Sequence, residues 1–434
     1  MRKWLIGPLV CAGLIGVTLG VSAFAVTTNP SDARRDTFQQ LDLYTTVLGQ
    51  IEKNYVEEVD ETKVIEASIN GMLSSLDPHS SYLSPDDFHE MAEQTRGEYG
   101  GLGIEVTSEE GAVKVVTPMD DTPASRAGIK SGDFLVGVDG VSIIGMPLDD
   151  ALKMLRGEAG TSLTITIARE GQEPFDVTLT RENIRPDSVR YEVKDGNIGY
   201  IRVSSFNERT SDTLDKAIDS LRKEIRGPMK GIVLDLRNNP GGLLDQAVKV
   251  SSRFIESGAI VSTKGRRPED NNRYNAVRTK RAPDVPIVVL INNGSASAAE
   301  IVAGALKDHK RAQILGLTSF GKGSVQTLTP LGPGKGAIRL TTSRYYTPSG
   351  GSIQGAGIEP DYEVANVRLS DEDIETLKRL QIRYNEAGLR NALENDQGLQ
   401  RKPPHIPANM PPEDYKGDDF QLEEALKLLE TGSL

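Results

Sequence analysis

One pattern occurs twice in this chain and constrains its fold more than any other feature. It consists of an apolar, β-branched strand, a turn that contains glycine, and a helix. The first copy runs from Gly231 to Ile255 and the second from Val285 to Leu306. Because the helix carries the chain back to the end of the sheet where the first strand began, the two strands run parallel. The pattern predicts an α/β core, which an expected strand at 198–203 and helix at 210–226 extend.

The second of these turns contains a serine in a position suited to catalysis. Residues 292–300 read Asn-Asn-Gly-Ser-Ala-Ser-Ala-Ala-Glu and join the strand at 286–291 to a helix. Amide groups at a helix N-terminus favour negative charge, which suits a reacting Ser297 and the oxyanion that it would create. The alternative is that Ser295 or Ser297 is only an N-cap. This turn alone leaves both interpretations open.

A lysine between two glycines lies twenty-five residues further along the chain. Lys322 is part of Phe-Gly-Lys-Gly-Ser-Val-Gln at 320–326 and follows the apolar run 312–317. A free lysine has a pKa of about 10.4, and burial lowers it by disfavouring the charged form. If Ser297 is a nucleophile, Lys322 is the best available base. The chain has four histidines, none of them in a comparable setting: His79, His89, His309 and His405.

The lysine stretch also matches the spacing of a phosphate-binding P-loop, at 316–322. The next residue should be Ser or Thr to hold magnesium, but it is Gly323. A helix should follow, whereas 325–333 contains threonines, prolines and alternating residues. We therefore expect no nucleotide site and no cofactor. Asp77 and His79 are too few ligands for a metal site, and we interpret them as residues that stabilise a turn.

The serine turn, the lysine spacing and Gln326, four residues after the lysine, together resemble the carboxy-terminal processing peptidases, which are tail-specific Ser-Lys proteases. The resemblance implies that Ser297 is the nucleophile and that Lys322 is its base. It implies that Gln326 orients the lysine amine; the alternative is an ordinary strand residue. The core would then have the crotonase-like fold of that family.

The resemblance also implies an oxyanion hole. One donor would be the backbone N–H of Ala298, next to the nucleophile, and the other would come from Gly241 or Gly242 at the end of the first strand. The two glycines could also serve only to make a tight turn between strand and helix. Which of them would donate is left open by the sequence.

Residues 98–182 resemble a PDZ domain inserted ahead of this core. A glycine-rich loop entering a strand allows several N–H groups to converge on a terminal carboxylate, and the strand can accept a peptide as an added strand. The helix at 147–155 would form the other wall of the groove, and Arg156 at its end would report groove occupancy to the core. The alternative is that Arg156 only complements the helix C-terminus. The expected binding residues are Gly100, Gly101, Leu102, Gly103 and Ile104.

The N-terminus reads as an export signal. Arg2 and Lys3 precede an apolar stretch, and Ala-Phe-Ala at 23–25 forms a small-x-small cleavage signal. We expect cleavage after Ala25 and a periplasmic or extracytoplasmic protein. An uncleaved inner-membrane anchor is the main alternative, and a lipid anchor at Cys11 is a third. Cys11 is the only cysteine, so a cleaved chain could form no disulfide.

The resulting prediction is a serine endopeptidase of the cell envelope that recognises the apolar C-terminal tails of protein substrates. The formal net charge is −12 with no long basic block, so nucleic acid is not expected as a partner. An envelope adaptor protein and a homo-oligomer through the terminal helices stay open as partners. The alternative function is a catalytically inactive PDZ adaptor, but this would predict loss of the serine or the lysine, and both are present.

These expectations divide the chain into successive parts. Helices are expected near 38–55, 63–76, 370–386 and 419–430, and a polar, basic mobile loop at 266–281. The expected parts are a leader at 1–25, a helical segment at 36–96 that contributes to the core, a PDZ domain at 97–183, the Ser-Lys core at 184–364 and a helical appendage at 365–434.

Overall fold

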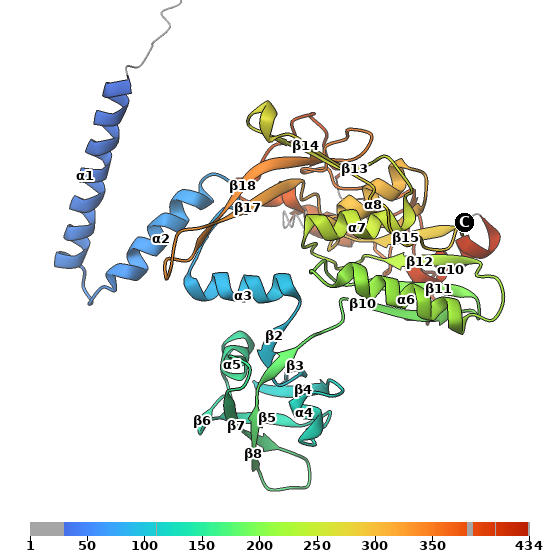
Figure 1. The fold of residues 1–434 in the computed structure, drawn as a ribbon, viewed down its shortest axis with the longest axis horizontal. Coiled ribbons are helices and arrows are strands. Elements are labelled where there is room, and N and C mark those ends of the chain that lie inside the picture. The colour runs from blue at the N-terminus through green and yellow to red at the C-terminus, as the bar shows by residue number, and fades with distance from the viewer. Residues whose placement is uncertain (1–29, 110, 380–384, 404, 433–434) are drawn as a thin grey trace, which may run out of the picture. The chain divides into compact units, whose positions relative to one another are not determined.

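The computed structural model describes residues 30–109, 111–379, 385–403 and 405–432 (Figure 1). The expected leader, with its cleavage signal and Cys11, lies outside the described residues. The chain divides into one unit at Met1–Ala67 and another at Ser68–Leu434. None of the described helices contains a stretch long and apolar enough to cross a membrane.

The first unit is helical, as the spacing of its apolar residues predicts. Helix α1 spans Pro30–Asn54, and α2, at Glu61–Ser74, begins in this unit and ends in the second. Several large apolar side chains of α1 are exposed to solvent within the single chain: Phe38, Leu41, Leu43, Tyr44 and Val47.

The core of the second unit is a sheet of six described strands in the order β10-β11-β12-β15-β16-β19. All neighbouring pairs from β11 to β19 are parallel, which confirms the α/β prediction, and only β10 runs antiparallel. The strands are β10 Val189–Lys194, β11 Ile198–Val203, β12 Gly231–Asp235, β15 Ile287–Ile291, β16 Gln313–Gly316 and β19 Tyr362–Glu363.

Helices cover both faces of this sheet (Figure 1). One face packs against three helices in a continuous apolar core, and the other packs against the last helix of the chain. The buried positions of the helices at 210–224 and 420–431 recur at helical spacing, so each of these two buries one face, whereas the helix at 298–308 is buried on all sides up to Leu306. The helices are α6 Thr210–Glu224, α7 Leu244–Phe254 and α8 Ala298–Asp308 on the first face, and α10 Phe420–Thr431 on the second.

A second sheet lies beside the turn that contains the lysine. Its order is β1-β18-β13-β14, and β17 pairs with β18. Lys322 lies two residues before β17, so a strand follows it and not the helix that a P-loop would require. The strands are β1 Ser81–Leu83, β13 Ala259–Gly265, β14 Asn272–Asn275, β17 Ser324–Pro330 and β18 Ala337–Tyr346.

The loop predicted at 266–281 is wrong in its centre. The 3₁₀ turn η1 spans Pro268–Asp270, and β14 then pairs antiparallel with β13. This strand lies at the edge of its sheet and its side chains are mostly exposed, so it needs no apolar alternation. Its polar composition therefore concealed it.

Residues 99–184 fold as a small β-rich body with its own apolar core. Five strands pair in the order β3-β4-β5-β7-β8, and β6 pairs with β5. Strands β2 and β9 form a separate two-stranded sheet. The elements are β2 Tyr99–Gly101, β3 Ile104–Glu109, β4 Ala112–Pro118, α4 Pro123–Arg126, β5 Phe134–Val138, β6 Val141–Ser142, α5 Leu148–Leu155, β7 Ser162–Ala168, β8 Phe175–Thr180 and β9 Glu182–Ile184.

Three further elements complete the described chain. Helix α3, at Pro85–Arg96, leads into this β-rich body. Helix α9 spans Asp371–Arg379, and the 3₁₀ turn η2 spans Glu386–Gly388. The prediction of one helix up to residue 386 is therefore wrong at its end, because Glu386 begins a separate turn, in which its own side chain is buried.

Candidate active site

The serine turn is strained at one residue. Ser297 lies between the end of β15 and the start of α8 and has φ 52° and ψ −112°. Positive φ is uncommon for a residue with a side chain and costs on the order of 1–3 kcal/mol. Ser295 has a different task, because its hydroxyl donates to the carbonyl of Leu236 at 2.8 Å and ties the turn to the end of β12. Of the two serines, only Ser297 combines backbone strain with the helix start.

A buried carboxylate joins the serine turn to residues 318–323, which contain Lys322 and which we call the lysine loop. Glu300 has no exposed surface, and its Oε2 accepts the backbone N–H groups of Ser297 at 2.7 Å and of Lys322 at 2.9 Å. Its Oε1 accepts the Ser319 hydroxyl at 2.5 Å and the Gly321 N–H at 2.7 Å. Residues 297 and 322 therefore lie around one oxygen atom.

The electrostatic setting of Lys322 favours a neutral amine. Burial, and then the positive charge of Arg339, lower the pKa of Lys322 below its usual value. Three carboxylates oppose this effect, those of Glu386, Glu300 and Asp77. The net direction is downward, as the apolar and glycine-rich surroundings of the lysine predicted.

Gln326 lies on β17 beside a network that reaches the N-terminal turn. Its Nε2 donates to Ser324 Oγ at 3.0 Å and to Thr341 Oγ1 at 3.1 Å. The Thr341 hydroxyl in turn donates to Asp77 Oδ1 at 3.0 Å. Asp77 also accepts the N–H of His79, so it stabilises the turn that was expected there. No group of His, Cys, Asp and Glu within the described residues could hold a metal ion.

The glycine pair lies against the serine turn. A Cβ built on Gly241 would come within 2.8 Å of Ser297 Cβ and 2.9 Å of the Ala298 N atom. The N–H of Gly241 already donates to Asn239 Oδ1 at 2.8 Å. The structure therefore brings together Ser297, Ala298 and the glycine turn. Of the two candidate glycine donors, Gly241 already has a hydrogen-bond acceptor in Asn239.

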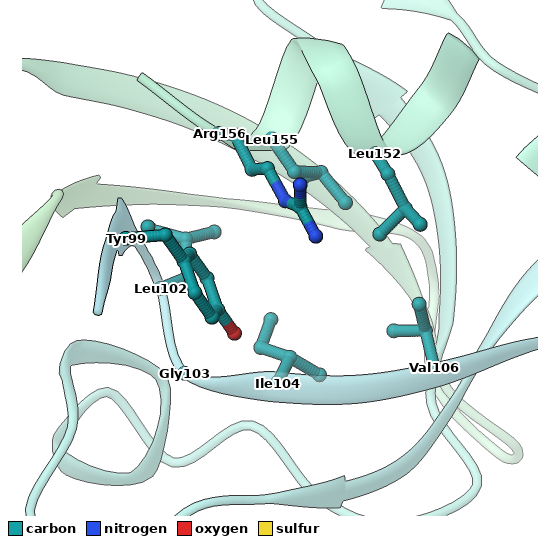
Figure 2. Close-up of a pocket in the computed structure, with 9 residues that line it drawn as sticks. Tyr99, Leu102, Gly103, Ile104, Val106, Leu152, Leu155 and Arg156 are labelled. Atoms are coloured by element: carbon teal, nitrogen blue, oxygen red, sulfur yellow. The ribbon is translucent and has the colours of Figure 1, made fainter. Parts of the chain in front are cut away.

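The β-rich body has a cavity at the place where a peptide groove was expected. A cavity of about 210 Å³ lies between β3 and α5 (Figure 2). Ile104 and Val106 of β3 face Leu152 and Leu155 of α5 across it. Its lining includes Gly101, Leu102 and Gly103, whereas Gly100 lies in β2 and its carbonyl accepts the N–H of Gly157 at 3.2 Å.

Arg156 lies at the end of this groove, directly after α5. Its Nη1 donates to Glu90 Oε1 of α3 at 3.0 Å, and its guanidinium lies 5.0 Å from the centre of the Tyr99 ring. Both side chains are partly exposed, so this ion pair contributes little to stability.

Comparisons with known proteins agree with this arrangement. The chain is 46% identical over 422 residues to the carboxy-terminal-processing protease of Bartonella bacilliformis. The aligned region covers 97% of this chain and 94% of the relative. The chain belongs to the carboxy-terminal processing peptidases. Their family model, peptidase family S41, matches residues 197–364, a PDZ model matches 114–169, and the N-terminal domain of the activating protease CtpB matches 21–87.

This peptidase is also 36% identical over 312 residues to the carboxy-terminal processing protease CtpA of Bacillus subtilis, covering 72% of this chain and 66% of the relative. A solved structure, the photosystem II D1 C-terminal processing protease, is 29% identical with a TM-score of 0.45, covering 82% of this chain and 99% of that one. Family membership makes the protein a serine peptidase with a PDZ domain and confirms the predicted fold class. The expected domain boundaries stay predictions.

Sequence reasoning missed several residues that shape the site. Glu300 lies three residues after Ser297, and Ser-x-x-Glu is the signature of a capping box that could have revealed it. Asn239, Arg339, Glu386 and Arg401 carry no such local signal. Arg339, Glu386 and Arg401 act through contacts between parts of the chain that are distant in sequence, whereas Asn239 acts on Gly241, two residues away.

Proposed function

We propose that this peptidase cleaves protein substrates near apolar C-terminal tails in the cell envelope, with Ser297 as nucleophile and Lys322 as general base. The observation that carries the proposal is the single Glu300 oxygen that accepts the N–H groups of both residues. A lysine with a lowered pKa suits the base of a Ser-Lys dyad, and strained residues such as Ser297 cluster at active sites. Gln326 would hold the amine in line from β17.

The oxyanion hole would consist of the N–H groups of Ala298 and Gly242. Gly241 is the poorer donor because its N–H donates to Asn239. The carbonyl groups of Gly241 and Phe206 accept the N–H groups of Phe206 and Leu243, so Gly242 lies in a turn that is fixed on both sides. Fixed donors stabilise a developing charge without reorganisation.

The dyad is tested with a fluorophosphonate probe and an unstructured fluorogenic peptide. Ser297→Ala should abolish labelling, and both Ser297→Ala and Lys322→Ala should lower turnover by about 10⁴-fold or more without loss of fold. Lys335→Ala, an exposed lysine in the loop before β18, is the matched control and should behave as wild type. Wild-type turnover in either dyad variant would exclude the mechanism.

The PDZ groove would select the tail. Its backbone can pair with an extended peptide along β3, and Leu102 and Ile104 offer an apolar surface to the last side chain. Arg156 would exchange Glu90 for the substrate carboxylate and so report groove occupancy. One peptide with a free apolar C-terminus, its amide, and a version that ends in Asp-Asp test this; equal cleavage of all three would rule out tail recognition. Arg156→Ala should slow cleavage of the first peptide only.

Export and assembly complete the proposal. The N-terminal sequence supports export, and N-terminal sequencing of the protein from cell fractions would separate cleavage after Ala25 from an uncleaved anchor. The exposed apolar side chains of α1 support a homo-oligomer. Light scattering of the chain with and without residues 30–54 would detect it. The same number of chains per particle in both versions would reject this interface.

A further inference from the structure

A segment that follows the family-matched region contacts both turns of the active site. We call residues 386–401 the strap; it lies beyond residue 364, where the peptidase family model ends. At one end of the strap, Arg401 Nη2 donates to the Thr318 carbonyl at 2.8 Å and to Asn293 Oδ1 at 3.0 Å. Its Nη1 donates to the Ser319 carbonyl. Asn293 belongs to the serine turn, and the two carbonyls belong to the lysine loop.

The other end of the strap contacts the lysine loop through Glu386. The backbone N–H of Glu386 donates to the Phe320 carbonyl at 3.0 Å. The Glu386 side chain, which has no exposed surface, accepts the Gln354 Nε2 at 2.9 Å and lies 2.8 Å from His79 Nε2. Gln354 Oε1 accepts the N–H of Gly323 at 3.0 Å. The residues on either side of Lys322 are thus fixed from Glu386.

We infer that Arg401 and Glu386 are positioning residues for the Ser-Lys dyad, supplied by the strap to keep the lysine loop in register with the serine turn. The inference rests on the proposed function. Neither side chain is assigned contact with substrate, so both act through the loops that they hold.

The chemistry of the guanidinium suits this task. Its planar fork donates from two nitrogen atoms in a fixed geometry to three acceptors on two separate turns, whereas an ammonium donates from one nitrogen only. Glu300 already holds the Ser319 hydroxyl and Ser297 N–H from inside, and Arg401 holds the Ser319 carbonyl and Asn293 from outside. The two turns are therefore fixed from both sides. A shift of about 1 Å between reacting groups can cost on the order of 100-fold in rate.

The test is Arg401→Met, which keeps much of the length of the side chain and removes the fork. We expect kcat on a short unstructured peptide, and the rate of fluorophosphonate labelling, to fall about 10- to 100-fold. KM and the affinity of a C-terminal peptide for the PDZ groove should stay within threefold. Arg401→Lys should recover only part of kcat. The control is Arg390→Met, because Arg390 lies on the same strap and is exposed.

The outcomes separate this inference from the dyad itself. Turnover by Ser297→Ala would defeat the proposed function, whereas an intact dyad with Arg401→Met equal to Arg390→Met would defeat only the role of the strap. A loss of titratable active sites with unchanged kcat per site would show that Arg401 acts on folding alone, and would also overturn the inference.

Glu386→Gln provides a second measurement if neither Arg401 variant folds. The charged groups that act on Lys322 are Arg339, Glu300, Asp77 and Glu386. Removal of the Glu386 charge should lower the pKa of Lys322 and move the acid limb of kcat/KM to lower pH, together with a fall in kcat. An unchanged profile and an unchanged kcat would reject a role for this end of the strap.

Discussion

Gly241→Ala should separate catalytic geometry from stability more clearly than any other single change in the core. The glycine has φ +101°, and a Cβ there would meet Ser297 Cβ at 2.8 Å, Ala296 O at 2.9 Å and Ala298 N at 2.9 Å. Carbon atoms in contact prefer roughly 3.5–4.0 Å, so the serine turn has to move by roughly 0.7 Å. The neighbours are backbone atoms and the Cβ of Ser297, the proposed nucleophile, and these cannot simply rotate away.

The expected effect follows from that displacement. A shift approaching 1 Å costs up to about 100-fold in rate, so kcat should fall roughly 10- to 100-fold. The positive φ should cost an additional amount of stability on the order of 1–3 kcal/mol. Gly227→Ala is the matched control, because Gly227 has φ +107° and a Cβ there would meet nothing within 4 Å.

The assay combines hydrolysis of an unstructured fluorogenic peptide with thermal unfolding of both variants. Both should lose stability through backbone strain, but only Gly241→Ala should lose activity. If Gly241→Ala hydrolyses the peptide within threefold of Gly227→Ala, the close approach of the glycine turn to Ser297 does not control catalysis.

Two further predictions concern charge. Arg339→Met should raise the pKa of Lys322, since burial and then Arg339 lower it, and should shift the acid limb of kcat/KM to higher pH; an unshifted limb would contradict this. Burial opposes ionisation of Asp235, yet hydrogen bonds from Arg237 outweigh it and hold the pKa of Asp235 below its usual value. This pair stabilises the fold above the unfolded pKa, near 4, and the contribution is lost as the pH falls through the folded pKa. Arg237→Met should therefore destabilise the chain by about 3–5 kcal/mol at pH 7, measured by urea unfolding, and a loss below 1 kcal/mol would refute it.

The sequence predicted those parts of the structure that local patterns encode. Apolar β-branched runs before glycine turns gave β12 and β15, and helical spacing gave α1, α6 and α7. The position of Ser297 between a strand and a helix is equally local. Edge strand β14 was not predicted, because an exposed strand needs no alternation of apolar and polar residues.

What the sequence could not predict are contacts between distant segments. Arg401 contacts Asn293 across 108 positions, and Glu386 lies beside His79 across 307. Neither contact has a sequence signature, because no local pattern links residues that are so far apart in the chain. The sequence thus reveals the proposed nucleophile and base more readily than the residues that hold them in place.

The shared carboxylate gives the pH dependence of this site two origins of the same sign. As the proposed base, Lys322 must lose its proton to act, so its titration would make the rate rise with pH. Burial raises the pKa of Glu300 to about 7, although hydrogen bonds from Ser319, Gly321, Ser297 and Lys322 oppose this. A protonated Glu300 has less capacity to accept its four donors, so its ionisation also favours activity at higher pH. Arg339 lowers the pKa of Lys322, so a variant at Arg339 moves the lysine titration.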